Sequence, residues 1–172
     1  MKKILFIVNV DWYFLSHRLP LALASKNSGY EVYVACKDTG KMDQIKQYDF
    51  HCFNLNIKRG SFSILNVFRN ILEVRGVIKK VDISILHAVS MQSIILGLMA
   101  TFFNTKIKFV AAVTGLGTLF LVNSLKANII KYFIIIFLAV GFRKRNLRVI
   151  VQNKDDKNYI NNIIMCPMNK IS

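Results

Sequence analysis

The sequence predicts an α/β protein with a doubly wound parallel sheet, the Rossmann-like architecture in which strands and helices alternate. Three observations support this prediction. Apolar runs of strand length alternate with amphipathic segments of helix length along the whole chain. The 172 residues are 53% hydrophobic, which suits one domain with a buried core. No repeat or low-complexity stretch interrupts the alternation.

Six segments have the composition of short strands. Residues 2–10 form an almost continuous apolar run, as expected for a central parallel strand that is buried on both faces. Residues 30–35 alternate in polarity and are rich in β-branched and aromatic side chains, which favours a second strand. The other expected strands cover residues 50–55, 83–87, 106–113 and 147–151.

Helical segments are expected after each strand. Residues 11–14 read as a polar and aromatic connection, and Ser16 as the N-cap of a helix that ends near Asn27. The helix expected over residues 63–80 has an apolar face made of Ile64, Leu65, Phe68, Ile71, Leu72 and Ile78. Other helices are expected over residues 42–48, 90–103 and 154–163, and up to Phe142.

The chain is strongly basic, with 24 Lys and Arg side chains against 9 Asp and Glu, a net charge of +15. Such an excess attracts phosphate-bearing partners, whether nucleic acid, anionic lipid or a diphosphate group. Nucleic acid is disfavoured because the sequence has no recognition-helix signature, aromatic RNA-binding pattern or zinc spacing. A membrane-facing basic patch is predicted at Arg143, Lys144, Arg145 and Arg148.

The longest strongly apolar stretch, residues 132–142, is too short to cross a membrane. As a helix it would span roughly 16 Å, about half of a hydrocarbon core. A helix in the protein core and a helix that dips into the membrane interface both fit this stretch, since the predicted basic patch follows it directly.

The sequence carries no familiar cofactor or metal motif. The first strand is followed by no glycine, and Gly115-Leu116-Gly117 lacks the third glycine and the acidic residue of a dinucleotide fingerprint. The three cysteines are too far apart in sequence to suggest a zinc site or a disulfide framework, so a reducing compartment is expected. We therefore expect neither a cofactor nor a metal.

Polar side chains follow four of the expected strands, at the edge where ligands bind in open α/β sheets. They are Asp11, Trp12, His17 and Arg18 after the first strand, His87 and Ser90 at the fourth, Thr114, Gly115 and Gly117 after the fifth, and Gln152 and Asn153 after the sixth. Arg18 could pair with a phosphate or stay exposed. His87 could be an acid or base, or a structural histidine.

Several segments together resemble one family. "DWYFLSHRLPLALASKNSGYEVYVA", "ILHAVSMQSIILGLMA", "AAVTGLGTLF" and "VIVQNKDD" are similar to the amino-terminal domain of bacterial glycosyltransferases of the GT-B fold, of the retaining family 4 type. Such enzymes typically build O-antigen, capsule or other surface polysaccharide at the cytoplasmic face of the membrane. The resemblance implies a Rossmann-like acceptor-side domain over residues 1–153 and the start of an interdomain connection over residues 154–172.

The resemblance also implies that two domains bind the two substrates. A second domain would hold a nucleotide-diphosphate sugar, and the domain present here would hold a lipid-linked saccharide acceptor. The implied acceptor site contains Asp11, Trp12, His17, Arg18, His87, Thr114, Gly115, Gly117 and Asn153, with no catalytic residue assigned. Asp11-Trp12-Tyr13 stands where some relatives carry a double glycine, and some relatives have a histidine near the position of Gly115.

Relatives of this kind are roughly twice as long as this chain. Transfer is therefore expected only with a second domain or subunit that supplies the donor, and the chain alone is expected to be inactive. The alternative is a non-catalytic subunit or scaffold that docks a separate donor-binding chain. The expected location is cytoplasmic, peripheral at the inner membrane face.

Overall fold

The computed structural model describes residues 2–57, 64–114 and 125–172. Its strands are β1 (Lys2–Val10), β2 (Tyr30–Lys37), β3 (His51–Asn54), β4 (Ile85–Val89), β5 (Lys108–Val113) and β6 (Leu147–Val151). They form one parallel sheet in the order β3-β2-β1-β4-β5-β6. The chain winds outward from β1 to β3 and then from β4 to β6, so the predicted doubly wound sheet is confirmed.

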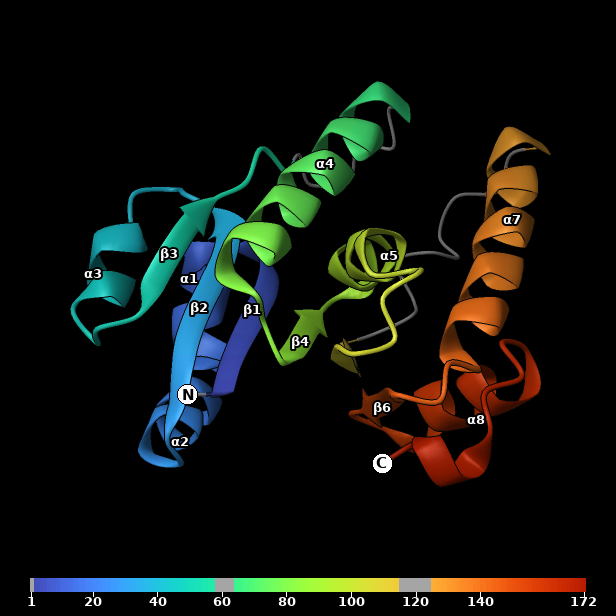
Figure 1. Ribbon diagram of the computed structural model, residues 1–172. Coiled ribbons are helices and arrows are strands. Elements are labelled where there is room, and N and C mark those ends of the chain that lie inside the picture. Colours follow the sequence, from blue (N-terminus) through green and yellow to red (C-terminus); the bar gives the residue numbers. More distant parts are fainter. Residues whose placement is uncertain (1, 58–63, 115–124) are drawn as a thin grey trace.

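Helices cover both faces of the sheet (Figure 1). One face carries α1 (Asp11–His17), α2 (Leu19–Asn27) and α3 (Met42–Lys46). The opposite face carries α4 (Ile64–Val81), α5 (Met91–Ala100), α7 (Leu125–Phe142) and α8 (Lys154–Asn162). Helices thus lie on both faces of the sheet, as expected for parallel strands joined by helical crossovers.

The core lies on both sides of β1. Leu5 and Ile7 belong to the cluster beneath α4 and α5, whereas Ile4 and Phe6 belong to the cluster beneath α1 and α2. Because successive side chains of a strand point to opposite faces, a strand buried on both sides needs an unbroken apolar run. This explains the composition of residues 2–10.

Two glycines allow close packing on the second face. A Cβ atom on Gly97 would lie 3.0 Å from the Phe109 ring and 3.2 Å from Leu86 Cδ2, so α5 lies directly on the sheet. A Cβ atom on Gly141 would lie 2.9 Å from Leu98 Cδ1. The absence of side chains at these positions therefore sets how closely α5 approaches the sheet and α7 approaches α5.

The start of the first helical region differs from the sequence prediction. Helix α1 begins at Asp11, directly after β1, so the connection predicted over residues 11–14 is helical. Ser16 lies inside that helix, where its hydroxyl donates to the Trp12 carbonyl at 2.9 Å, and it is not an N-cap. Pro20 lacks the N–H that would continue the helix, and the chain bends at Arg18 between α1 and α2.

Helix α4 agrees with the predicted range within one residue at each end, but its buried face differs. Val74 and Val77 are buried, whereas Phe68 is 62% exposed and Leu72 is 51% exposed. The apolar surface of α4 is therefore wider than its contact with the sheet, and Phe68 and Leu72 of the predicted apolar face lie outside the core.

Helix α7 also has two different sides. Leu138 and Phe142 are buried in the core, while Phe133 and Val140 are exposed. As predicted, none of the helices in the described ranges has both the length and the apolar character needed to cross a bilayer.

Residues 154–172 pack against β6 and the same core. Ile160 and Ile164 are buried, and the Ser172 N–H donates to the Val149 carbonyl at 2.9 Å. The Lys170 ammonium donates to the last carbonyls of the α7 region, at Phe142 (3.4 Å), Arg143 (2.9 Å) and Lys144 (2.7 Å). A cation at this position also suits the negative end of the helix dipole.

Candidate functional site

The sheet reverses its strand order between β1 and β4, and open α/β sheets bind ligands at the carboxyl edge of such a point. Three polar side chains meet there. Asn9, near the end of β1, accepts hydrogen bonds at its Oδ1 atom from Ser90 Oγ and Ser93 Oγ, both at 2.9 Å. The cluster joins β1 to the first turn of α5.

Ser90 has an unusual backbone conformation. Its φ of 79° lies in a region that residues other than glycine rarely adopt. The Ser90 N–H donates to the Ala112 carbonyl on β5 at 3.1 Å, which fixes the turn against the next strand. Strain of this kind costs about 1–3 kcal/mol and tends to occur at functional sites.

The three residues differ in access to solvent. Ser93 is fully buried, so its hydroxyl holds Asn9 in place, while Asn9 and Ser90 are half-buried at the edge. A serine hydroxyl that donates its hydrogen still has lone pairs to accept with, and an amide nitrogen carries two donors. Asn9 and Ser90 therefore present an uncharged donor and acceptor pair that suits a hydroxyl-bearing ligand.

Asp11, a predicted acceptor-site residue that follows Asn9 by two positions, is fully buried. Its carboxylate accepts from the backbone N–H groups of Trp12 (2.7 Å), Thr39 (2.6 Å) and Lys41 (2.8 Å) and from the Thr39 hydroxyl. Burial alone would raise the pKa of Asp11, but these hydrogen bonds outweigh it and the pKa is lowered. The carboxylate thus anchors the loop between β2 and α3 to the start of α1.

Two other predicted residues, Arg18 and His87, lie near one another on the α1 side of the sheet. His87 is 3% exposed, its ring lies 5.1 Å from that of Phe6, and its Nε2 atom has no hydrogen-bond partner. Arg18 is half-buried, and its Nε atom is also without a partner. Burial and then the Arg18 charge lower the pKa of His87 to about 4, so the imidazole is neutral at pH 7.

The remaining predicted site residues are spread along the carboxyl edge and beyond it. His17 ends α1 and stacks on the Tyr13 ring, Trp12 is partly exposed, and Thr114 is half-buried after β5. Asn153 caps α8 by accepting from the Asp156 N–H at 2.7 Å. It follows β6, three strands from β1 and thus about 14 Å away. Gly115 and Gly117 lie outside the described residues.

The residues of the predicted basic patch have different surroundings. Lys144 donates to the Thr101 carbonyl at 2.8 Å and lies 5.1 Å from the centre of the Phe102 ring, and burial lowers its pKa. Arg143 contacts the Met165 sulfur at 3.9 Å. Arg148 is exposed on β6, and Arg145 is exposed after α7. Lys144 therefore also stabilises the end of α5.

Sequence reasoning missed Asn9 and Ser93. The available signal was a polar residue near the end of an otherwise apolar strand, since burying an amide is costly unless its hydrogen bonds are satisfied. The described residues contain no group of three or more His, Cys, Asp or Glu side chains that could hold a metal ion.

The strand order and the polar cluster at the switch point define a Rossmann-like domain with a ligand edge. The family model for glycosyl transferase 4-like proteins matches residues 3–153, so the chain belongs to that family. None of the curated protein sequences is significantly similar to this chain.

Solved structures of low sequence identity share the fold. A glycosyltransferase from Rickettsia africae ESF-5 matches with a TM-score of 0.69 and 16% identity, over 99% of this chain and 42% of that protein. Sucrose-phosphate synthase from Thermosynechococcus elongatus matches with a TM-score of 0.64 and 13% identity, over 95% of this chain and 45% of that protein. A UDP-N-acetylglucosamine 2-epimerase matches with a TM-score of 0.63 and 14% identity, over 99% and 47%.

The chain thus spans less than half the length of these proteins and has the architecture of one half of a GT-B glycosyltransferase. At such identities the likeness concerns the fold. The epimerase has the same fold, so the assignment to a transferase family depends on the family model.

Proposed function

We propose that this chain is the acceptor-side half of a sugar transferase that works on a lipid-linked saccharide in surface-polysaccharide synthesis. The family match over residues 3–153 carries the proposal. The Asn9, Ser90 and Ser93 cluster supports it, because uncharged donors and acceptors at the switch point suit a sugar hydroxyl.

The donor in this proposal is a nucleotide-diphosphate sugar held by a second domain or a separate chain. Transfer requires the anomeric carbon of the donor and the acceptor oxygen to be held at about 3–3.5 Å, which can lower the barrier by roughly 7–11 kcal/mol. In this arrangement the carboxyl edge fixes the acceptor hydroxyl, and the donor half completes the geometry. A retaining outcome is part of the proposal.

The test is turnover with a panel of nucleotide sugars and a lipid-diphosphate-linked saccharide. The chain alone is compared with the chain fused to a donor-binding half of the same family. We expect product only from the fusion. Sugar epimerisation without transfer, or no turnover with any donor, would contradict the proposal.

Substitutions at the edge make the test more specific. Ser90→Ala removes a proposed acceptor contact, and Ser93→Ala releases Asn9 from its support. Both are expected to raise the KM for the acceptor about tenfold, since one hydrogen bond is worth about 1.4 kcal/mol, while the KM for the donor is unchanged. Ser25→Ala, at a half-buried serine of α2 whose hydroxyl donates to the Leu21 carbonyl, is the matched control.

A further inference from the structure

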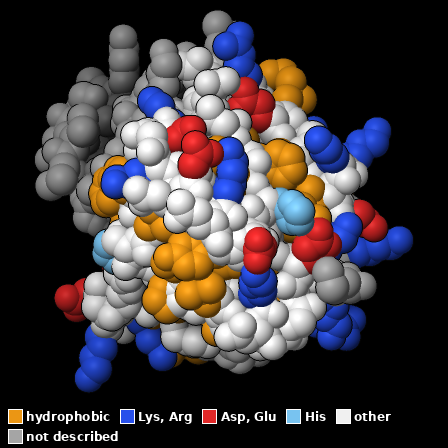
Figure 2. All heavy atoms as spheres, turned by 90° about the vertical axis from the view of Figure 1, so that its left-hand side faces the viewer, with side chains coloured by type: hydrophobic (Ala, Val, Ile, Leu, Met, Phe, Trp, Pro, Cys, Tyr) orange, Lys and Arg blue, Asp and Glu red, His pale blue; other side chains and the backbone are white. Residues whose placement is uncertain are grey.

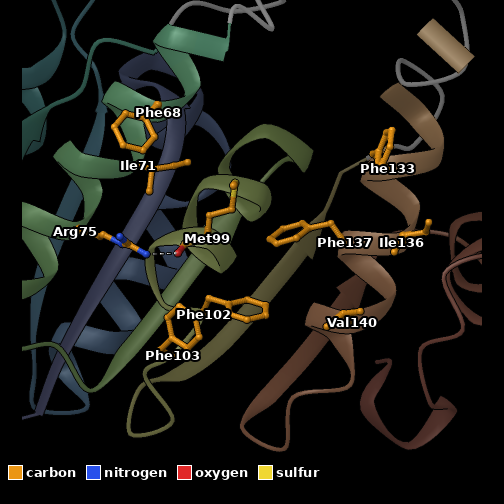
Figure 3. Close-up of a pocket in the computed structure, with 10 residues that line it drawn as sticks. All are labelled: Phe68, Ile71, Arg75, Met99, Phe102, Phe103, Phe133, Ile136, Phe137 and Val140. Atoms are coloured by element: carbon orange, nitrogen blue, oxygen red, sulfur yellow. Dashed lines mark hydrogen bonds between the residues drawn. The ribbon is translucent and has the colours of Figure 1, made fainter. Parts of the chain in front are cut away.

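An apolar groove lies between α4, α5 and α7, on the face of the sheet opposite α1 and α2 (Figure 3). Its volume is about 540 Å³. Phe68 and Ile71 contribute one wall and Phe133, Ile136 and Val140 the other, with Met99, Phe102 and Phe137 between them. The Phe102 and Phe137 rings stack at 6.3 Å across the groove.

The apolar surface continues outside the groove. Residues 133, 136 and 140 lie on one side of α7 at helical spacing, and all three are exposed. Leu72 on α4 and Phe103 after α5 are exposed as well. Contiguous apolar surface of this kind on a folded protein marks a binding site for another apolar surface.

Basic side chains lie beside the groove. Helix α4 carries four Lys and Arg side chains and one acidic residue. The Lys144 ammonium lies 5.1 Å from the centre of the Phe102 ring, which lines the groove. Arg75 lines the groove and donates to the Met99 carbonyl at 3.3 Å. Glu73, the acidic residue of α4, accepts from Asn56 at 3.1 and 3.2 Å.

An apolar patch together with basic side chains is the combination that binds anionic lipid bilayers. Aromatic and aliphatic side chains enter the acyl boundary, and Lys and Arg reach the headgroup phosphates. A second copy of the chain fits less well, because both copies would carry a net charge of +15.

We propose that the α4–α5–α7 groove face is the surface that docks this protein on an anionic lipid bilayer. The docking surface is then the apolar side of α4 and α7 with the basic residues of α4, and not the segment 143–148 alone. The proposal deepens the proposed function, because a membrane-bound acceptor must reach the domain from a bilayer. Helices α4, α5 and α7 lie on the same face of the sheet, with α5 between the other two (Figure 1).

The first experiment is flotation of the full chain with two kinds of vesicle, pure phosphatidylcholine and phosphatidylcholine mixed with phosphatidylglycerol. We expect binding to the anionic vesicles that weakens as salt is added. Equal binding to both vesicles, or none to either at low salt, would overturn the proposal.

Matched variants identify the surface. Phe133→Ser combined with Ile136→Ser is expected to weaken vesicle binding at least about tenfold, since each side chain would bury apolar area in the bilayer. Leu21→Ser on α2 is the control, because Leu21 is 42% exposed and Ile136 is 44% exposed. An equal loss in the control, or no loss in the double variant, would contradict the assignment of this face.

A spectroscopic readout tests insertion directly. Trp12 is the single tryptophan, so Phe133→Trp in a Trp12→Phe background reports on the groove face alone. We expect its emission to move to shorter wavelength with anionic vesicles, and Leu21→Trp in the same background to stay unchanged. A shift for Leu21→Trp alone would place the membrane on the other face.

Charge and self-association complete the test. Arg69→Gln with Lys79→Gln should lower anionic-vesicle binding more than Lys37→Gln with Lys46→Gln on the other half of the sheet. Concentration-dependent dimers that Phe133→Ser disperses would make the groove an interface between copies and overturn the proposal. Vesicle binding without turnover by the fusion would refute the proposed function and leave this inference standing.

Discussion

The two faces of the sheet differ in how they meet solvent. On the side of the molecule that carries α3 and β3, acidic and basic side chains are interspersed with apolar patches (Figure 2). Ion pairs join Lys26 to Asp49 at 2.9 Å and Lys46 to Asp43 at 2.7 Å. On the face with α4, α5 and α7, aromatic and aliphatic side chains are exposed around a groove.

The difference shows that one domain can carry two kinds of surface over one continuous sheet. The first face has the mixed charges of an ordinary soluble protein. The second has apolar area beyond what its core uses, because α4 and α7 bury one side and expose another apolar side. We infer that the second face binds a partner, whereas the first face is in contact with water.

The largest expected effect separates the two sides of α7. Phe142 is 0% exposed and Phe133 is 66% exposed in the same helix. Phe142→Ala should lower the free energy of unfolding by about 3–5 kcal/mol through the cavity it leaves, and Phe133→Ala by less than about 0.5 kcal/mol. Urea denaturation followed by circular dichroism measures both. Similar losses in the two variants would mean that both sides of α7 are structural.

The next effect concerns the α1 side of the sheet. Because the pKa of His87 is about 4 in the folded state and about 6.5 when unfolded, the unfolded chain binds more protons between these values. Stability should therefore be highest above pH 6.5 and fall by about 3 kcal/mol as the pH drops to 4. His87→Gln should flatten that part of the profile. An unchanged profile in the variant would assign the pH dependence to other groups.

Asp11 gives a smaller effect on the same side. Asp11→Asn keeps the shape of the side chain but removes the charge that accepts from three backbone N–H groups and one hydroxyl. We expect a loss of about 2 kcal/mol in unfolding free energy. Hydrogen exchange at the Thr39 and Lys41 amides should also become faster. Asp38→Asn is a nearby exposed control, and equal losses in both variants would argue against the anchoring role of Asp11.

The smallest effect is expected at the surface ion pairs of the first face. Lys26→Met keeps the apolar stem and removes the pair with Asp49, whose side chain is 88% exposed. Exposed pairs are worth at most about 1 kcal/mol, so the unfolding free energy should change by less than that. A loss comparable to that of Phe142→Ala would show that the charged face carries more of the stability than its exposure indicates.

The sheet was predictable because parallel strands that are buried on both faces consist of continuous apolar runs. Residues 2–10 and 147–151 were predicted as strands with the bounds that the structure gives them. The start of α1 was not predictable in the same way. Asp11 begins that helix, and its carboxylate accepts hydrogen bonds from residues 28 and 30 positions later. The helix propensities of neighbouring residues do not reflect such distant contacts.

The candidate site was predictable only as an edge of the sheet. Asn9 meets Ser90 and Ser93 across 81 and 84 positions of sequence, so the cluster exists only once β1 and β4 are neighbours. The exposure of Phe68 could not be inferred either. Helical periodicity locates an apolar side of α4, but a helix whose apolar surface exceeds its core contact gives the same pattern as one that is fully packed.

The contact between Gly141 and Leu98 has a consequence for the groove that α7 borders. With no side chain at position 141, the helix rests against α5 and the width of the groove is already set before anything enters it. Because the groove is already open, no binding free energy is needed to open it for a ligand. Gly141→Ala would force Leu98 or α7 to shift and so change the shape of the groove, although no residue lining the groove would have been altered.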